Sequence, residues 1–444
     1  MEIINNLEVI PKTSLKTKDV ETIKQVNKTN KTIYYVKLTN NGGICPRCGL
    51  YVTRIKDYST LKITHSKDIF ISYKRRRFKC DCGYSFYEYN PFSGKEISIS
   101  FNCIKEILEE LKRYNHPYLE VAQRYDLSVT KIIEVFDSYV QIPRHPLREV
   151  ISIDEFYFSR RSKDKYAFLI LGLNGEILDI VKSRKKSTLL DYFQSIPLEE
   201  RIKVKYVTMD MNKIYKDVIN RRIPKAIICI DSFHVVANIN KALDDLRIKV
   251  MNLYSKDKLS DEYYLLKKCR FFLFTDEYNF NVYRYNKHFK MKMYDYELRD
   301  RLFKICPDIE LAFFLKEEYR TFNKKIHSLD YIHKFLDSYI EECLSSNIDE
   351  FIIIGNLIDN WKVEIANSFI IYKDKRLSNG KIENRNHYIK SLLNIANGYS
   401  NFERFRNRVM YSENYYEKID YELKDKRIKR HFPKRGKYKK SAAS

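Results

Sequence analysis

The spacing of apolar positions changes along the chain, and each spacing predicts a different kind of element. Residues 51–79 alternate apolar and polar side chains in YVTRIKDY and IFISYKRRRF, which is typical of strands with one buried face. From Ile104 the apolar period becomes helical in CIKEILEELKRY, YLEVAQRY and VTKIIEVFDSYV. A short break, DLS, separates the last two runs, and Ser128 can cap the final helix. We therefore predict a small β module followed by a helix-turn-helix.

A mixed sheet is predicted further along the chain. Three strand-like runs come first, EVISIDEFYF, KYAFLILGLN and EILDIVKS, and the turn Asn174-Gly175 joins the second to the third. Helical and strand-like runs then alternate as LLDYFQSI, VKYVTMD, IYKDVINR, AIICID and VVANINKALDDLRIKV. Three meandering strands followed by alternating helices and strands is the order of a ribonuclease-H-like sheet.

Size and charge add a partner to this picture. A chain of 444 residues exceeds what one hydrophobic core usually supports, so two or three domains are expected. Its 82 Lys and Arg against 58 Asp and Glu give a formal net charge of +24, which favours a polyanion such as nucleic acid. Richness in Lys, Asn, Ile and Tyr, as AT-biased coding would give, is the alternative explanation. No apolar run is long enough to cross a bilayer and no signal-peptide layout opens the chain, so a cytoplasmic protein is expected, and binding to DNA would make it nucleoid-associated.

Four of the nine cysteines form two close pairs. Cys45 and Cys48 lie in CPRCG, and Cys80 and Cys82 lie in CDCG. Two thiolate pairs separated by a hairpin-length segment suit tetrahedral zinc, although the second pair is one residue shorter than usual. The spacing predicts a zinc ribbon, with unrelated free thiols as the alternative.

Two basic segments near the amino end are candidates for DNA contact. The tract beside the second cysteine pair would face phosphate, and the second helix of the helix-turn-helix would present polar side chains to a groove. Plain helical packing is the alternative for the latter. The candidate residues are Lys74, Arg75, Arg76, Arg77, Thr130 and Lys131.

Three carboxylates stand in unusual settings. Asp154 ends the strand-like run EVISID, Asp210 ends KYVTMD, and Glu383 lies downstream in SNGKIENRNHYIK. A strand that ends in Asp holds its carboxylate on a rigid element, and clustered carboxylates are tolerated when cations offset their repulsion. Magnesium or manganese fits such an oxygen-rich site. For each Asp taken singly, a cap or turn role is the alternative.

Asp231 competes with Asp210 for second place in this site. It follows the next strand-like run in IDSFHVV, and His234 lies about one helical turn beyond it. We interpret Asp231 and His234 as an accessory pair that positions the site or the substrate. A structural cap for the helix after Asp231 is the alternative.

Arginines and aromatic residues alternate after Glu383, which is typical of a surface that handles DNA ends. A solvated helix face is the alternative. The candidates for DNA contact in this region are Arg385, Lys390, Arg404, Arg406 and Arg408, and a basic tail follows.

Several of these motifs, taken in order, resemble one known family. CPRCG, the helix-turn-helix, SIDEF, VTMDM, IDSFHVVANIN, SNGKIENRNHYIK and GYSNFERFRNR follow one another along nearly the whole chain. In this respect the sequence is similar to bacterial insertion-sequence transposases of the DDE type in the ISL-three (ISL3) family. The resemblance implies a catalytic triad of Asp154, Asp210 and Glu383 that holds divalent metal, with Asp231 and His234 as a D-x-x-H element.

The resemblance also implies an organisation and an activity. The long separation of Asp210 from Glu383 implies an all-helical insertion in the catalytic domain, and residues 255–365 have a helical, charged and aromatic pattern. The expected domains are a zinc ribbon at 1–95, a helix-turn-helix at 96–142, a catalytic domain at 148–254 and 366–412, the insertion at 255–365 and the tail at 413–444.

A transposase of this kind would bind the inverted repeats of its element as a homo-oligomer on double-stranded DNA, then cleave and transfer strands. The competing hypotheses are a catalytically silent DNA-binding regulator derived from a transposase and a nuclease of the same fold.

Overall fold

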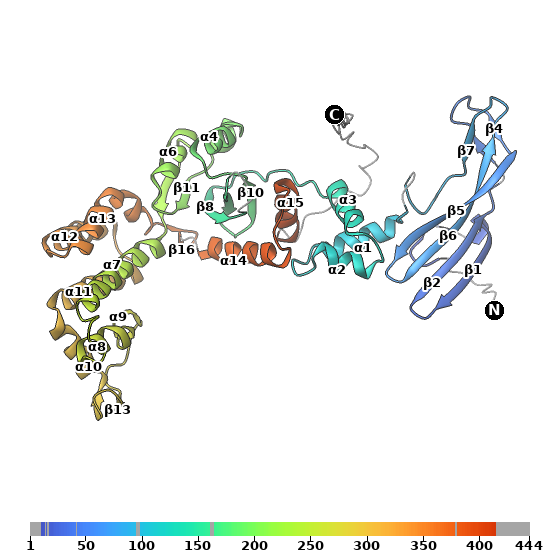
Figure 1. The fold of residues 1–444 in the computed structure, drawn as a ribbon. Coiled ribbons are helices and arrows are strands. Elements are labelled where there is room, and N and C mark those ends of the chain that lie inside the picture. Colours follow the sequence, from blue (N-terminus) through green and yellow to red (C-terminus); the bar gives the residue numbers. More distant parts are fainter. Residues whose placement is uncertain are drawn as a thin grey trace, which may run out of the picture. The chain divides into compact units, whose positions relative to one another are not determined.

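The computed structural model describes residues 10–13, 15, 17–40, 42–94, 98–159, 164–377 and 380–413, so nearly all of the expected basic tail lies outside the described residues. The chain divides into two compact units. The first comprises residues 1–143 and 391–444, and the second comprises residues 144–390. Figure 1 labels the helices and strands of both units.

A mixed sheet, with both antiparallel and parallel strand pairs, begins the first unit. Its strands run in the order β1-β2-β6-β5, and β7 pairs with β6. Alternation along β6 buries Ile71 and Tyr73 on one face, where they pack with Ile63 and Phe92, and leaves Lys74 exposed on the other. The bounds are β1 Val20–Lys28, β2 Lys31–Leu38, β5 Ile55–Ser66, β6 Ile69–Lys79 and β7 Ser85–Tyr87, with a short 3-10 helix at Thr17–Asp19 and a separate pair, β3 Gly43–Ile44 and β4 Tyr51–Val52.

Four helices complete the first unit: α1 (Phe101–Leu111), α2 (Tyr118–Arg124), α3 (Val129–Tyr139) and α15 (Phe402–Glu413). Ser128 caps α3, since its side chain accepts a hydrogen bond from the Lys131 amide at 3.2 Å. The reversal between α2 and α3 includes Asp126 in the left-handed region at φ 53°. The local sequence therefore produces two short helices joined by a tight turn, as its periodicity indicates.

The second unit is built on a five-stranded sheet in the order β10-β9-β8-β11-β12. β8, β9 and β10 pair antiparallel, whereas β8, β11 and β12 run parallel. Gly175, at φ 83°, makes the β9–β10 turn that the Asn-Gly pair predicts. The bounds are β8 Val150–Tyr157, β9 Tyr166–Gly172, β10 Ile177–Val181, β11 Tyr206–Met209 and β12 Ile227–Ile230.

Helices cover this sheet and account for its nearly continuous burial. They are α4 (Lys186–Gln194), α5 (Leu198–Arg201), α6 (Lys213–Arg222) and α7 (Ser232–Leu253). α4 and α6 lie beside each other near β11, and α7 continues away from the sheet toward α11 (Figure 1). The order of strands and helices along the chain agrees with the one expected from the sequence.

The segment at 255–365 is mostly helical but not entirely so. Its helices are α8 Asp261–Lys268, α9 Phe271–Phe274, α10 Asp295–Ile305, α11 Pro307–Lys324, α12 Leu329–Ser345 and α13 Asp349–Asn367, and between α9 and α10 lies a ribbon of β13 (Tyr283–Asn286) and β14 (Met291–Tyr294). The all-helical expectation therefore needs correction. The run YRYNKHFKMKMY places polar or charged residues at every second position around a turn, which is the period of a strand pair.

One hydrophobic core joins the sheet to this insertion. It extends from Ile151 and Met209 of the sheet through Leu243 of α7 to Trp361 of α13. Trp361 is buried and packs in this core, and the Lys216 ammonium lies 4.9 Å from its ring centroid. The insertion is therefore part of the same folded unit as the sheet.

The chain returns to the sheet through β15 (Ile371–Tyr372) and β16 (Lys375–Arg376), and α14 (Gly380–Ile395) follows. Within the part of the chain that the structure describes, no helix has the length and apolarity needed to span a membrane.

Candidate active site

Asp154 and Asp210 lie at the same end of neighbouring parallel strands. Asp154 is in β8, and Asp210 directly follows β11. The register pairs Ser152 of β8 with Thr208 of β11, so each Asp is two residues beyond a paired position. The hydroxyls of Ser152 and Thr208 are 2.7 Å apart and buried, which ties the two strands together beneath the carboxylates. The register thus brings together two carboxylates that lie far apart in the sequence.

The Asp154 carboxyl is partly buried and electrostatically strained. Burial, followed by the nearby charge of Asp210, raises its pKa from the ordinary 3.8 to about 7. Two donors reach it: the Glu155 amide at 2.7 Å from Oδ1, and the Asn386 side-chain amide at 2.5 Å from Oδ2. An Asp in this setting binds a proton or a cation far more readily than a surface Asp does.

Asp210, Asp231 and His234 form a tight group beside Asp154. One potential ligand atom from each of the three lies within 4.8 Å of the others. His234 Nε2 is 2.8 Å from Asp210 Oδ1 and 3.9 Å from Asp231 Oδ2. The bond to Asp210 raises the pKa of His234, although burial opposes the change. This donor set, two carboxylates and an imidazole with a third carboxylate nearby, has the chemistry of a divalent-cation site.

Asp231 also has the structural role that was its alternative interpretation. It is the N-cap of α7, and its side chain accepts a hydrogen bond from the Phe233 amide at 3.4 Å. Asp231 is only 3% exposed. The cap fixes Asp231 at the start of α7, and the same helix then carries His234 to Asp210.

Glu383 stands apart from this group. It lies in the first turn of α14 with an exposed side chain, and the cluster found among the described residues does not include it. The same helix is fixed to the sheet by Asn386, which bonds to Asp154, and by two bonds to the β9–β10 turn: Lys381 Nζ to the Leu173 carbonyl at 3.0 Å and Arg385 Nε to the Gly175 carbonyl at 2.8 Å.

Sequence reasoning missed Asn386. It lies three residues after Glu383, about one helical turn further along, and it is buried. The available signal was this spacing, because residues three positions apart in a helix are neighbours on its surface.

A second set of polar contacts lies next to Asp154. Glu155 accepts hydrogen bonds from the Tyr215 hydroxyl and from Arg184. Burial, with the bond to Glu155, raises the pKa of Tyr215. Tyr215 comes from α6, so this contact connects the helix after Asp210 to the strand that carries Asp154.

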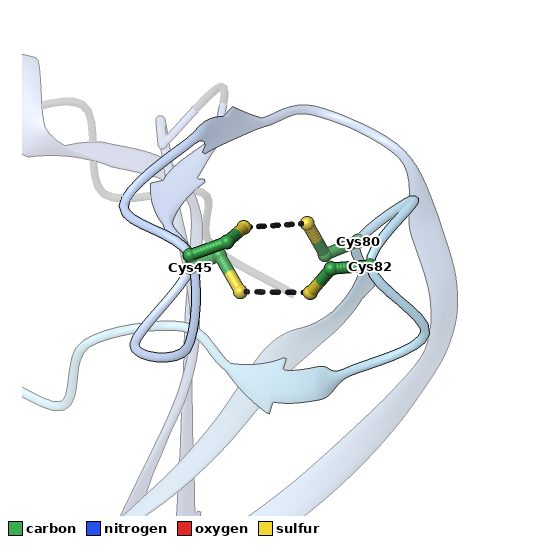
Figure 2. Close-up of side chains that lie close together, drawn as sticks. Cys45, Cys80 and Cys82 are labelled. Atoms are coloured by element: carbon green, nitrogen blue, oxygen red, sulfur yellow. Dashed lines mark hydrogen bonds between the residues drawn. The ribbon is translucent and has the colours of Figure 1, made fainter.

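The four cysteines form the second cluster with metal-ligand chemistry. One Sγ from each of Cys45, Cys48, Cys80 and Cys82 lies within 4.8 Å of the others. Cys45 Sγ is 3.7 Å from Cys82 Sγ, and Cys48 Sγ is 3.4 Å from Cys80 Sγ. Figure 2 shows the Cys45 side chain opposite those of Cys80 and Cys82. The cluster is compatible with zinc.

The pKa values of two of these thiols, Cys45 and Cys80, shift in opposite directions. Burial raises the pKa of Cys45, but backbone amides of Cys48 and Arg47 outweigh it and lower the value to about 7. For Cys80, the backbone amide of Cys82 lowers the pKa, but burial and the neighbouring thiols together outweigh it and raise the pKa to about 12. Once one thiol ionises, its charge keeps the proton on its neighbour, which a bound cation would reverse.

The predicted DNA contacts fall into three groups. Lys74, Thr130 and Lys390 are exposed, while Arg75, Arg77 and Lys131 are partly buried. Arg75 and Arg77 stack on Tyr87, with guanidinium-to-ring distances of 3.8 and 5.4 Å. This group remains accessible to a ligand.

The other predicted contacts hold the fold together. Arg76 is buried and bonds to Glu88 and to the Leu38 carbonyl, both at 2.9 Å. Arg408 is only 2% exposed and donates to the carbonyls of Arg113 and His116. For these two arginines the DNA-contact interpretation is replaced by a packing role, because each guanidinium satisfies buried acceptors.

Arg385, Arg404 and Arg406 are intermediate cases. Arg385 bonds to the β9–β10 turn, Arg404 forms a two-point pair with Asp137 at 2.8 and 2.7 Å, and Arg406 donates to the Ile142 carbonyl at 2.7 Å. These contacts occupy their guanidinium groups within the protein.

With this geometry in place, comparison with known proteins defines the class. A family model described as a transposase matches residues 151–409, which include all of the sheet except the first residue of β8, together with the insertion and α14. The matched segment is more than half of the chain. The model is that of the ISL3 family, and the chain belongs to this family of insertion-sequence transposases.

Curated relatives agree. The chain is 24% identical over 258 residues to the transposase for insertion sequence element IS1001 of Bordetella parapertussis, a match that covers 55% of this chain and 62% of that protein. It is 30% identical over 117 residues to the transposase for insertion sequence element IS1557 of Mycobacterium tuberculosis, which covers 26% of each chain. The chain thus spans less than two thirds of the length of either relative in these matches.

Proposed function

We propose that this protein binds the terminal inverted repeats of its own insertion sequence, cleaves a strand at each end and transfers the released end into target DNA. The observation that carries the chemistry is the parallel pairing of β8 with β11, which places Asp154 beside Asp210 on the five-stranded sheet, and the strand order of this sheet supports a ribonuclease-H-like fold. The elevated pKa of Asp154 is the electrostatic consequence of that placement.

The residues at this site fit a divalent cation, magnesium or manganese. Asp154 and Asp210 supply hard oxygen ligands, and their mutual repulsion is relieved by positive charge. Bound there, such cations would stabilise charge on both the attacking and the leaving oxygen of a phosphodiester. In this proposal Glu383, carried by α14, is the third ligand of the triad.

His234 and Asp231 are positioning residues in this proposal. His234 holds one oxygen of Asp210, and Asp231 fixes the start of the helix that carries His234. Asn386 does the same for Asp154 through its 2.5 Å bond. These contacts restrict the two carboxylates to one orientation, which in-line displacement needs.

The first unit supplies DNA recognition in the same proposal. The zinc ribbon, held by Cys45, Cys48, Cys80 and Cys82, supports the basic strand β6, and α3 presents its exposed face to a groove. The accessible candidates are Lys74, Arg75, Arg77, Thr130 and Lys131. A net charge of +24 favours two or more copies on a shared DNA rather than free in solution.

The test is a joining assay with the full chain. A labelled element end is incubated with protein, magnesium and a target plasmid, and end binding, cleavage and joined product are measured separately. We expect Asp154→Ala, Asp210→Ala and Glu383→Ala each to abolish cleavage and joining while they leave end binding unchanged. Asp191→Ala, at an exposed position on α4, is the matched control and should retain all three activities.

Each outcome assigns a function. Joined product from any triad variant would remove that residue from the catalytic set. Binding without cleavage by the wild-type protein would favour a silent regulator, and cleavage without joining would favour a nuclease of the same fold.

A further inference from the structure

The ribbon of β13 and β14 in the insertion has two unlike faces. Its register pairs Tyr283 with Tyr294, Arg284 with Met293, Tyr285 with Lys292 and Asn286 with Met291. Because side chains alternate along a strand, Tyr283, Tyr285, Lys292 and Tyr294 share one face, and Arg284, Asn286, Met291 and Met293 share the other.

The second face anchors the ribbon. Met293 is 1% exposed, and Asn286 is 9% exposed. Arg284 Nε donates to Asp295 Oδ1 at 2.9 Å, and Asp295 is fully buried at the start of α10. These contacts fix the ribbon to the insertion.

The first face carries large aromatic rings into solvent. Tyr283 and Tyr285 are each 56% exposed, Tyr294 is 38% exposed, and the neighbouring Tyr296 is 37% exposed. Ring centroids of Tyr283 and Tyr294 are 4.7 Å apart, and those of Tyr294 and Tyr296 are 5.1 Å apart and nearly parallel. We call these four residues the tyrosine face. Exposed aromatic rings in such a group mark an interaction surface.

Positive charge lies at the tip side of the tyrosine face, while at its other end the Glu297 carboxylate accepts a hydrogen bond from the Tyr294 amide at 2.7 Å. Lys292 lies on it, directly opposite Tyr285, and Lys287 and Lys290 are in or next to the turn at the tip. All three lysines are exposed. A second copy of the chain would bring the same net charge of +24, so like charges oppose self-association through this tip.

We propose that the tyrosine face binds unpaired bases of DNA by stacking, while Lys287, Lys290 and Lys292 contact the adjoining phosphates. A duplex offers only base edges and backbone to a protein, whereas a base outside the stack offers a flat ring that a tyrosine can cover. This inference rests on the proposed function only in naming the source of such bases, the element end opened during cleavage.

The test uses the full chain and a fluorescent single-stranded oligonucleotide of random sequence, so it does not require transposition. Tyr283→Ala and Tyr285→Ala should each weaken binding by about fivefold or more, since stacking one base contributes on the order of 1–3 kcal/mol. Tyr285→Phe keeps the ring and should bind as the wild type does. Tyr331→Ala removes a 50%-exposed tyrosine of α12 in the same insertion and is the matched control.

Two further measurements separate stacking from other causes. Affinity for a blunt duplex should be unchanged in the Tyr→Ala variants, and iodouracil placed in the single strand should photocrosslink to Tyr283 or Tyr285 in the unmodified protein. The crosslink keeps the inference testable if a variant fails to fold.

Equal affinity of wild type and Tyr→Ala variants for the single strand, or crosslinks confined to the first unit, would overturn the inference. A change in oligomeric state of the Tyr→Ala variants by sedimentation, with unchanged DNA affinity, would overturn it in favour of a protein interface. If the wild-type protein does not cleave the element end, this result counts against the proposed function but does not affect the stacking result.

Discussion

Replacing Asp154 by Asn should stabilise the metal-free protein, and only above a defined pH. The native carboxyl keeps its proton up to about pH 7, whereas an unfolded Asp loses it near its ordinary value of 3.8. Between these values the native state binds more protons than the unfolded state, so wild-type stability falls as pH rises through this window. Asn resembles the protonated carboxyl and does not titrate.

The magnitude follows from the same pKa. A pKa difference of one corresponds to about 1.4 kcal/mol, so the change from 3.8 to about 7 corresponds to up to about 4 kcal/mol. The advantage of Asp154→Asn should be close to zero near pH 4, grow with pH and reach its full value above about pH 7. His234 remains paired with Asp210 in both proteins, so its own titration largely cancels in the comparison.

Urea unfolding in the presence of a chelator measures this difference. The chain has a single tryptophan, Trp361, which is buried in the core shared by the sheet and the insertion, so its fluorescence reports the unfolding of this unit. Asp191→Asn, an exposed carboxylate on α4, is the matched control. If Asp154→Asn and wild type keep the same stability difference from acid to alkaline pH, the electrostatic account of the site is refuted.

Two more predictions concern the first unit. Glu88→Gln should destabilise it by about 2 kcal/mol, because the buried Arg76 loses the fully buried one of its two charged partners and keeps only the more exposed Glu21; circular dichroism during urea unfolding measures this, and a cost no larger than that of Glu109→Gln in an exposed pair would contradict it. Cys45→Ser should lower the zinc content of purified protein, measured by metal analysis, whereas Cys306→Ser outside the cluster should not. Unchanged zinc in Cys45→Ser would show that the four thiols do not hold the metal.

Much of the second unit could be predicted from local pattern. Three apolar runs, the Asn174-Gly175 turn and two further runs ending in Asp210 and Asp231 predict strands in the order that the structure shows. The membership in the ISL3 family is likewise confirmed by the family match. Local patterns succeed here because a strand buried on both faces must be apolar throughout.

The candidate site was less predictable. Sequence reasoning named Asp154, Asp210, Asp231 and His234, which the structure brings together, but it did not identify Asn386, which bonds to Asp154. It also assigned Arg76 and Arg408 to DNA. A buried arginine and an exposed one have the same letter in the sequence, and only the acceptors around the guanidinium distinguish them.

The sequence by itself determined where the chain forms strands and helices, which cysteines pair by spacing, and which strands end in carboxylates, because these depend on residues close together in the chain. The tertiary structure alone decided that β8 and β11 pair in a register that sets Asp154 beside Asp210, that Asn386 is buried against Asp154 while Glu383 is exposed, and that tyrosines of the β13–β14 ribbon face solvent. Those outcomes depend on which distant segments pack together, and on how much each polar group gains or loses when water is removed.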